Sequence, residues 1–129
     1  MNQPADVLKV FMRDFWNQTQ AHPFTKTLSM FCVEGIPVVL FDVGTRDGAI
    51  WLENIHSTQE GHGYGSQALD WFCALADKHG VEIRGEIYPP QGSTLGVEEL
   101  AAWYQRHGFT VDGHKICREP RIAPEKVDQ

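Results

Sequence analysis

The sequence predicts a single-domain α/β (α+β) fold in which helices flank a mixed central sheet. Its 129 residues match the length of one domain, and 42% hydrophobic and 22% charged residues are ordinary for a globular protein. An early pair of strand patterns joined by a short turn predicts an antiparallel hairpin. A later strand, helix and strand in succession predict a parallel pair. The domain is expected to span residues 1–118, and residues 119–129, with two prolines and mixed charge, are expected to form a flexible tail.

The first predicted element is an amphipathic helix. Pro4 suits a first helical turn, and apolar side chains then recur at helical spacing. These side chains are Val7, Leu8, Phe11, Phe15 and Trp16. We expect the helix to end near Ala21 and His22, because the residue before Pro23 disfavours helical geometry.

Three strands joined by short turns are predicted next. Thr27–Val33 and Pro37–Val43 are rich in β-branched and aromatic residues, and Glu34–Ile36 is typical of a hairpin turn between them. The segment Gly44–Gly48 then turns the chain into a strand over Ala49–Ile55. The result is an antiparallel meander.

A glycine-rich turn over residues 60–65 comes before a helix that Gly80 closes as a left-handed cap. The apolar positions of that helix are Ala68, Leu69, Phe72, Leu75 and Ala76. The alternating Gly61, Gly63 and Gly65 leave backbone N–H groups unshielded at the positive end of the helix, which suits a phosphate or diphosphate. The alternative is that this stretch is only a turn, since it matches neither a Walker loop nor the dinucleotide fingerprint.

The remaining pattern continues the alternation of strands and helices. We expect a strand over Val81–Tyr88 that pairs in parallel with the strand before the helix, through a right-handed crossover. After it come a loop over Pro89–Gly96, a helix over Val97–Arg106, and short strands over Phe109–Val111 and His114–Cys117 around an Asp112-Gly113 turn.

Composition excludes several classes of function. The net charge of −6 argues against nonspecific nucleic-acid binding and is compatible with a cationic substrate. No run approaches the roughly 20 apolar residues that span a bilayer, and the N-terminus lacks a signal-peptide plan. We therefore expect a cytoplasmic protein with no membrane partner. The three cysteines predict buried reduced thiols, and the histidine spacing predicts no metal site.

Two motifs together resemble those of the GNAT superfamily of acetyl-CoA-dependent N-acetyltransferases. The first family signature is Arg/Gln-x-x-Gly-x-Gly/Ala between a strand and a helix. Residues 60–65 are similar to it, with the two pattern glycines at Gly63 and Gly65. The second signature, aromatic-Tyr-x-basic-x-Gly-Phe, is similar to residues 103–109. One helix and one strand are expected between them, as in the family, and the similarity covers residues 28–118.

The resemblance implies that acetyl-CoA is the co-substrate and that no metal is needed. The diphosphate would lie on the glycine-rich turn, and the pantetheine arm would lie along the strand that precedes it. In the family that strand splays from its parallel neighbour, and its backbone N–H groups polarise the acetyl carbonyl. The implied coenzyme A contacts are Asn54, Ile55, Gly61, His62, Gly63, Tyr64, Gly65 and Ser66. For His62, the alternative is an exposed turn residue.

The resemblance also implies two catalytic residues. Tyr104 matches the general acid that protonates the coenzyme A sulfur, and its alternative interpretation is a packed helix tyrosine. Glu86 lies where relatives that acetylate protein N-termini carry a carboxylate, and would be the general base; its alternative is a solvent-facing strand residue. Glu53 or an ordered water are the substitutes for this base.

Three departures from the family pattern keep a rival interpretation open. Glu60 replaces the usual Arg or Gln, Val97 replaces a frequent Asn, and one helix stands where the family often has a strand and two helices. The main hypothesis is an N-acetyltransferase that acts by direct attack of a protein N-terminus, a lysine or a small amine. The alternatives are a non-catalytic protein-binding module with a weakened coenzyme A groove and, more distantly, a nucleotide-binding regulator. Either a monomer or a homodimer is compatible with the sequence.

Overall fold

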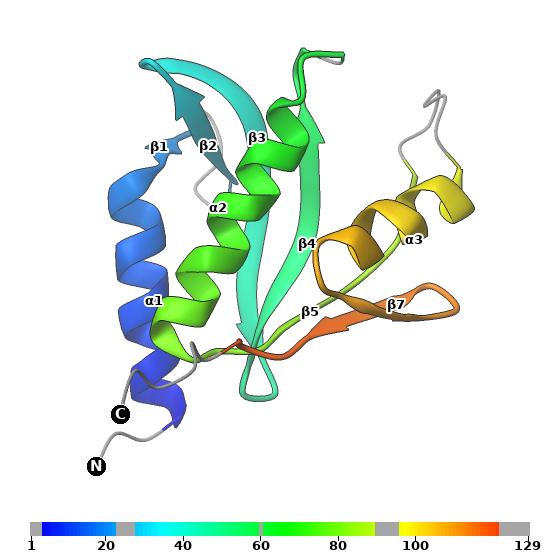
Figure 1. Ribbon diagram of the computed structural model, residues 1–129. Helices are drawn as coiled ribbons and strands as arrows, with labels where there is room; N and C mark the ends of the chain where they lie inside the picture. Colours follow the sequence, from blue (N-terminus) through cyan, green and yellow to red (C-terminus); the bar gives the residue numbers. More distant parts are fainter. Residues whose placement is uncertain (1–3, 23–27, 60, 90–95, 122–129) are drawn as a thin grey trace, which may run out of the picture.

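A single seven-stranded mixed sheet organises the computed structural model, which describes residues 4–22, 28–59, 61–89 and 96–121 (Figure 1). The strands lie in the order β1-β2-β3-β4-β5-β7-β6. The elements are α1 (Pro4–Gln18), β1 (Gln20–Ala21), β2 (Leu28–Val33), β3 (Ile36–Arg46), β4 (Ala49–Ser57), α2 (Tyr64–His79), β5 (Ile83–Glu86), α3 (Val97–Arg106), β6 (Thr110–Asp112) and β7 (Lys115–Arg118). The predicted mixed sheet flanked by helices is confirmed.

The predicted antiparallel meander is confirmed, with tighter turns than expected. β2, β3 and β4 pair antiparallel in succession. Glu34 and Gly35 form the first turn with φ values of 53° and 82°, and Asp47 and Gly48 form the second with 55° and 78°. Two consecutive positive φ angles match the right-handed twist of paired strands. β3 therefore continues to Arg46, through residues that the sequence analysis assigned to a turn.

The N-terminal helix is shorter than predicted, because a strand follows it. α1 ends at Gln18, and Gln20–Ala21 pairs antiparallel with β2 in the register of Gln20 opposite Met30. This strand was not predicted from the sequence. Two residues are too few to show a strand period, so only the pairing with β2 defines it.

The helices cover one face of the sheet, with α2 between α1 and α3. Phe41 of β3 has its ring centroid 5.7 Å from that of Phe15 in α1 and 5.1 Å from that of Phe72 in α2. On the other side of α2, Asp70 contacts His107 at the end of α3 through a 2.7 Å hydrogen bond. Figure 1 shows α2 between the two outer helices, in front of the sheet. The opposite face of the sheet carries no helix in the described part of the chain.

The parallel pair β4–β5 separates after three residue pairs. Ile50–Leu52 pairs with Ile83–Gly85, and β4 then continues to Ser57 without β5 beside it. The separation begins at Glu53, an extra residue in the β3–β4 ladder, where the pairing shifts from Leu52 to Asn54. Such a bulge bends its strand and increases the local twist. The two strands diverge from this point in Figure 1.

The last strand is fastened to α2 by an ion pair in which the arginine is buried and the aspartate half-buried. Arg118 is only 4% exposed and donates to both carboxylate oxygens of Asp77, at 2.7 and 3.1 Å. Its Nε also donates to the carbonyl of His107 at the end of α3. Beyond the predicted domain limit at residue 118, the backbone N–H of Arg121 donates to Asp77 as well. Residues 122–129 of the predicted tail lie outside the described residues.

Candidate functional site

The first turn of α2 presents backbone N–H groups that have no partner among the residues that the structure describes. The first hydrogen bond inside the helix runs from Gln67 N–H to the carbonyl of Gly63. The N–H groups of Gly63, Tyr64, Gly65 and Ser66 donate to no atom among the described residues. No acidic side chain lies in this turn. These amides lie at the positive end of a 16-residue helix, so the turn suits an anion.

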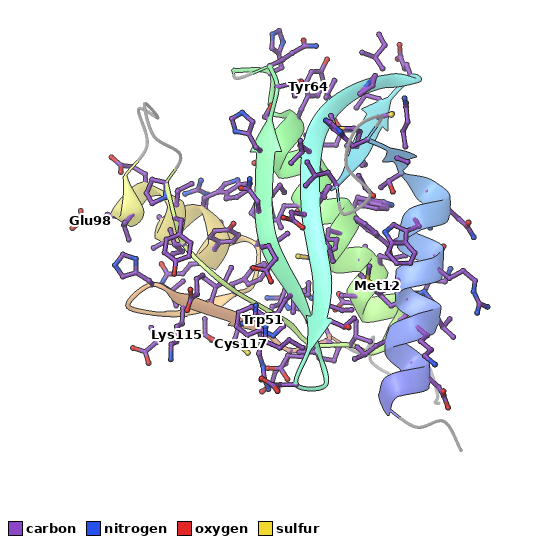
Figure 2. All side chains as sticks on the ribbon, turned by 180° about the vertical axis from the view of Figure 1, so that it is seen from behind. Met12, Trp51, Tyr64, Glu98, Lys115 and Cys117 are labelled. Atoms are coloured by element: carbon purple, nitrogen blue, oxygen red, sulfur yellow. The ribbon has the colours of Figure 1, made fainter. Side chains whose placement is uncertain are left out.

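The glycines of the turn are open on their outer side. Gly61 and Gly63 have φ values of 88° and 73°, and a methyl group on either would meet no atom within 4 Å. The exposed His62 ring stacks on Tyr64 with the centroids 5.5 Å apart. Figure 2 shows Tyr64 at the end of the molecule where β4 stops and α2 begins. Glu60, whose charge weighs against a diphosphate at this turn, lies outside the described residues.

Trp103 of α3 adjoins this first turn. Its indole Nε1 donates to Oγ of Ser66 over 2.8 Å, and its ring lies 3.8 Å from where a methyl group on Gly65 would be. The sequence analysis did not assign Trp103 to the site. The only signal for Trp103 in the sequence was its place beside Tyr104 in the second motif. That motif does not predict a contact with Ser66, which lies 37 positions earlier.

Asn54 and Ile55 lie on the segment of β4 that has separated from β5. Asn54 is exposed and Ile55 half-buried. Because β3 occupies one edge of this segment and no described strand occupies the other, its outward backbone groups are available to a ligand. The splayed edge that the family resemblance implied is therefore present, at the same end of the sheet as the first turn of α2.

Tyr104 lies on the helix-covered face and is 7% exposed. Its ring packs against Phe109 with the centroids 5.2 Å apart. Burial, with the nearby Cys73 thiol as a smaller cause, raises the pKa of Tyr104 to about 12. The phenol therefore keeps its proton at neutral pH, which suits a proton donor. Its hydroxyl makes no hydrogen bond within the described part of the chain.

Glu86 lies on the opposite face of the sheet. It is half-buried between the buried Gly85 and Ile87, and its cross-strand neighbour is Lys115. Figure 2 shows Lys115 on this open face. The Tyr88 hydroxyl donates to Glu86 Oε1. Together with Asp112 and His114, these residues line a hollow of about 560 Å³. Glu86 thus lies on the open face just after the last β4–β5 pair, whereas Tyr104 lies on the helix-covered face.

Glu53, the substitute base, already has a partner. Its Oε2 accepts a hydrogen bond from Arg46 Nη2 at 2.9 Å, and the two side chains are 43% and 53% exposed. Burial, and secondarily the Glu53 charge, raises the pKa of Asp42 on the neighbouring strand. The Arg46 guanidinium also lies over the Trp51 ring, 3.9 Å from its centroid. Glu53 and Glu86 therefore each accept a hydrogen bond from a neighbouring side chain, Arg46 and Tyr88 respectively.

The other expectations concern groups outside this site. Cys32, Cys73 and Cys117 are free thiols, but only Cys73 is buried, so the predicted burial is wrong for the half-buried Cys32 and Cys117. Val97 packs against the core. In the described ranges no cluster of His, Cys, Asp and Glu could hold a metal ion, and no helix is long and apolar enough to cross a bilayer.

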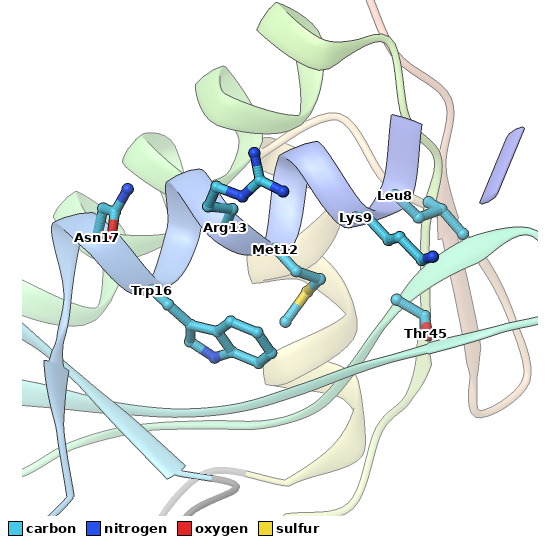
Figure 3. Close-up of a pocket in the computed structure, with 7 residues that line it drawn as sticks. All are labelled: Leu8, Lys9, Met12, Arg13, Trp16, Asn17 and Thr45. Atoms are coloured by element: carbon cyan, nitrogen blue, oxygen red, sulfur yellow. The ribbon is translucent and has the colours of Figure 1, made fainter. Parts of the chain in front are cut away.

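A hollow of about 550 Å³ between α1 and β3 is shown in Figure 3. It is lined by Leu8, Lys9, Met12, Arg13, Trp16, Asn17 and Thr45. None of the predicted site residues lines it, so it is not part of the candidate site.

No protein-family model matches the sequence, and no curated protein matches it. The fold, in contrast, matches solved structures over nearly its whole length. Ard1 from Thermoplasma volcanium is 14% identical with a TM-score of 0.57, and the match covers 93% of this chain and 95% of that one. The ribosomal-protein-S18-alanine N-acetyltransferase from Escherichia coli is 15% identical with a TM-score of 0.56, over 99% and 96%. A GNAT family acetyltransferase from Elizabethkingia anophelis, solved with acetyl-CoA bound, is 12% identical with a TM-score of 0.55, over 92% of each chain. The chain therefore has the fold of the GNAT acetyltransferases.

Proposed function

We propose that this protein transfers the acetyl group of acetyl-CoA to an amine. One observation carries the proposal: at one end of the sheet, the amides of the first turn of α2 and the free edge of β4 both lack partners within the described part of the chain. An anion binds well at the first feature, and an extended amide chain binds well along the second. Coenzyme A contains both parts, a diphosphate and a pantetheine arm.

The residues of the site fit this co-substrate. Gly61 and Gly63 carry no side chain that would block the amides, and added methyl groups would point into open space. The Ser66 hydroxyl extends the row of donors along the first turn. The His62 imidazole is exposed beside the turn and is available to a phosphate.

The chemistry of transfer assigns one proton to each catalytic side chain. The thioester supplies a carbonyl carbon that a neutral amine nitrogen attacks, so that a C–N bond forms and the C–S bond breaks. Glu86 would accept the proton that the amine loses, from the open face of the sheet. Tyr104 would donate a proton to the departing sulfur from the helix-covered face. Backbone N–H groups near Asn54 would stabilise the developing oxyanion, a contribution of about 2.7–4 kcal/mol for one donor.

The acceptor would enter from the open face, where the hollow next to Glu86 lies. The candidates are a protein N-terminus, a lysine or a small amine. The rival proposal is a non-catalytic binding module, motivated by Glu60 and Val97. Val97 packs against the core, and its apolar side chain cannot make the hydrogen bonds of the Asn that it replaces.

Titration with coenzyme A by calorimetry separates these functions. We expect binding in the micromolar range, followed by release of thiol from acetyl-CoA when amines are screened. A binding module without a working groove gives no heat of binding, and a nucleotide-binding regulator prefers ATP. Either result would refute the acetyltransferase proposal.

Replacement of the proposed base, Glu86→Gln, tests the reaction itself. We expect turnover at neutral pH to fall by about 10²-fold or more, with partial recovery at high pH, where the amine loses its proton unaided. Glu98→Gln is the matched control, because Glu98 is an exposed glutamate on α3 that accepts no hydrogen bond from the described residues. An unchanged pH profile of Glu86→Gln would assign the proton transfer to water or Glu53.

A further inference from the structure

Trp103 connects the two helices that carry the proposed site. It precedes Tyr104 on α3, and its Nε1–H donates to the Ser66 hydroxyl in the first turn of α2, over 2.8 Å. Its ring also contacts Tyr104 and His107, with centroid distances of 5.0 and 5.5 Å. The donor and acceptor are part-buried, so this hydrogen bond is shielded from competition with water.

In the hydrogen bond between Trp103 and Ser66, the indole must be the donor and the hydroxyl oxygen the acceptor. An indole N–H can only donate, so it occupies a lone pair of Ser66 Oγ and leaves the hydroxyl hydrogen free to donate elsewhere. The hydroxyl finds no acceptor in the described ranges, and the first turn of α2 contains no carboxylate. The free O–H therefore belongs to the same row of unpartnered donors as the amides of Gly63–Ser66.

We propose that Trp103 is a positioning residue that acts through Ser66, holding the serine hydroxyl as a donor to the diphosphate bound at the first turn of α2. The inference rests on the proposed function, because that function places a diphosphate at this turn. It explains a tryptophan at position 103, since a phenylalanine would keep an aromatic ring there but has no N–H with which to orient Ser66. Tyr104 keeps its own role, because the proposed path runs from Trp103 to Ser66 and not through the phenol.

Two substitutions separate this role from packing. Trp103→Phe keeps an aromatic ring and removes the N–H, whereas Ser66→Ala removes the hydroxyl. We expect each to raise the Kd of coenzyme A and the KM of acetyl-CoA by about tenfold and to leave kcat unchanged, because a donor to a charged group is lost or misdirected. The double variant should lose little more than either single variant, because both act on one contact.

Ligands with and without the diphosphate complete the test. S-acetylpantetheine lacks the diphosphate, so its kcat/KM should be the same in the wild type and in Trp103→Phe. Inorganic pyrophosphate should bind more weakly to Trp103→Phe than to the wild type. Trp16→Phe is the matched control, since Trp16 is a 55% exposed tryptophan on α1, away from the site.

The outcomes distinguish the inference from the function. Normal coenzyme A binding in Trp103→Phe, equal losses with S-acetylpantetheine, or additive losses in the double variant would each overturn the inference while the acetyltransferase proposal stands. If pyrophosphate binding depends on Trp103 but acetyl-CoA is not a substrate, the inference survives and the function fails. If the wild type binds neither coenzyme A nor pyrophosphate, both are wrong.

Discussion

At the scale of single residues, the surroundings of each side chain determine which proton it can hold. Tyr104 lies in the core, and burial raises its pKa to about 12, so the phenol is protonated throughout the neutral range. Cys73 beside it has a pKa raised to about 12, chiefly by burial, and is an inert thiol rather than a competing nucleophile. Cys117 donates to Glu82 and has a pKa raised to about 11, again with burial as the first cause. Tyr104 therefore keeps its proton at neutral pH, as the proposed proton donor must.

Tyr104→Phe tests this assignment. We expect kcat to fall by about 10²-fold, because the departing sulfur loses its proton donor. The Kd of coenzyme A and the free energy of unfolding should change little, since the hydroxyl bonds to none of the described residues. Steady-state thiol release, calorimetry and urea unfolding measure the three quantities. Turnover equal to the wild type would remove Tyr104 from the mechanism.

At the scale of the elements, β4 and β5 lie unusually close together at Leu52 and Gly85, the last residue pair before the two strands separate. A methyl group at Gly85 would lie 2.6 Å from the Leu52 carbonyl oxygen and 3.5 Å from the Ile116 side chain. Leu52 and Gly85 are the last pair of the parallel ladder, and Glu53 is the bulged residue after it. The absence of a side chain at position 85 lets the strands meet there, and the bulge then directs β4 away.

Gly85→Ala should therefore destabilise the fold. The clash is with a backbone atom, so one strand must shift, and such overpacking costs about 1–3 kcal/mol. Gly44→Ala is the matched control, because a methyl group at this position in β3 meets nothing within 4 Å and its φ is not positive. Urea unfolding of both variants checks the prediction. Equal stability of Gly85→Ala and Gly44→Ala would contradict the close approach described here.

At the scale of the whole molecule, α2 is the element to which both α1 and β7 are fastened by ion pairs. On one side Asp14 of α1 contacts Lys78 and His79, at 3.2 and 2.8 Å. On the other side Asp77 forms an ion pair with Arg118, the last residue of β7. Burial raises the pKa of Asp77, but the hydrogen bonds and charges of Arg118 and Arg121 outweigh it and leave that pKa below its ordinary value. Both carboxylates therefore stabilise the fold in their ionised form.

The Asp14 contacts predict a specific response to acid. The hydrogen bonds from His79, and then from Gln18 and Lys78, lower the pKa of Asp14 from 3.8 to about 2. Because the folded pKa is the lower one, the stabilisation is complete above about pH 4 and disappears as the pH falls toward 2. Asp14→Asn should be less stable than the wild type at neutral pH, and the difference should shrink over this acid window. Asp6→Asn, at an exposed carboxylate of the same helix, is the control. Urea midpoints between pH 2.5 and 7 measure both, and a difference independent of pH would refute the assignment.

Local patterns in the sequence were sufficient to predict most of the helices and strands. They also predicted the part of the candidate site that the glycine-rich turn and α2 form. The helical spacing of α2, its Gly80 cap and the glycine-rich turn before it depend on residues close together in the chain. Such features appear in the sequence because side-chain spacing and glycine content act within a few residues. The parallel pairing of β4 with β5 was also predictable, because two strands joined by a helix usually pair in parallel through a right-handed crossover.

The rest was decided only when the sheet and helices packed together. Four features depend on a partner far away in the sequence. They are the strand β1, the bulge at Glu53, the Trp103–Ser66 hydrogen bond and the Arg118–Asp77 ion pair. Strand register and helix packing bring these partners together, and neither can be derived from the spacing of residues along one segment. The order of most elements and the glycine-rich turn before α2 thus follow from the sequence by itself. The separation of the strands and the partners of the site residues follow from the tertiary structure, because contacts across tens of residues exist only after the chain has packed.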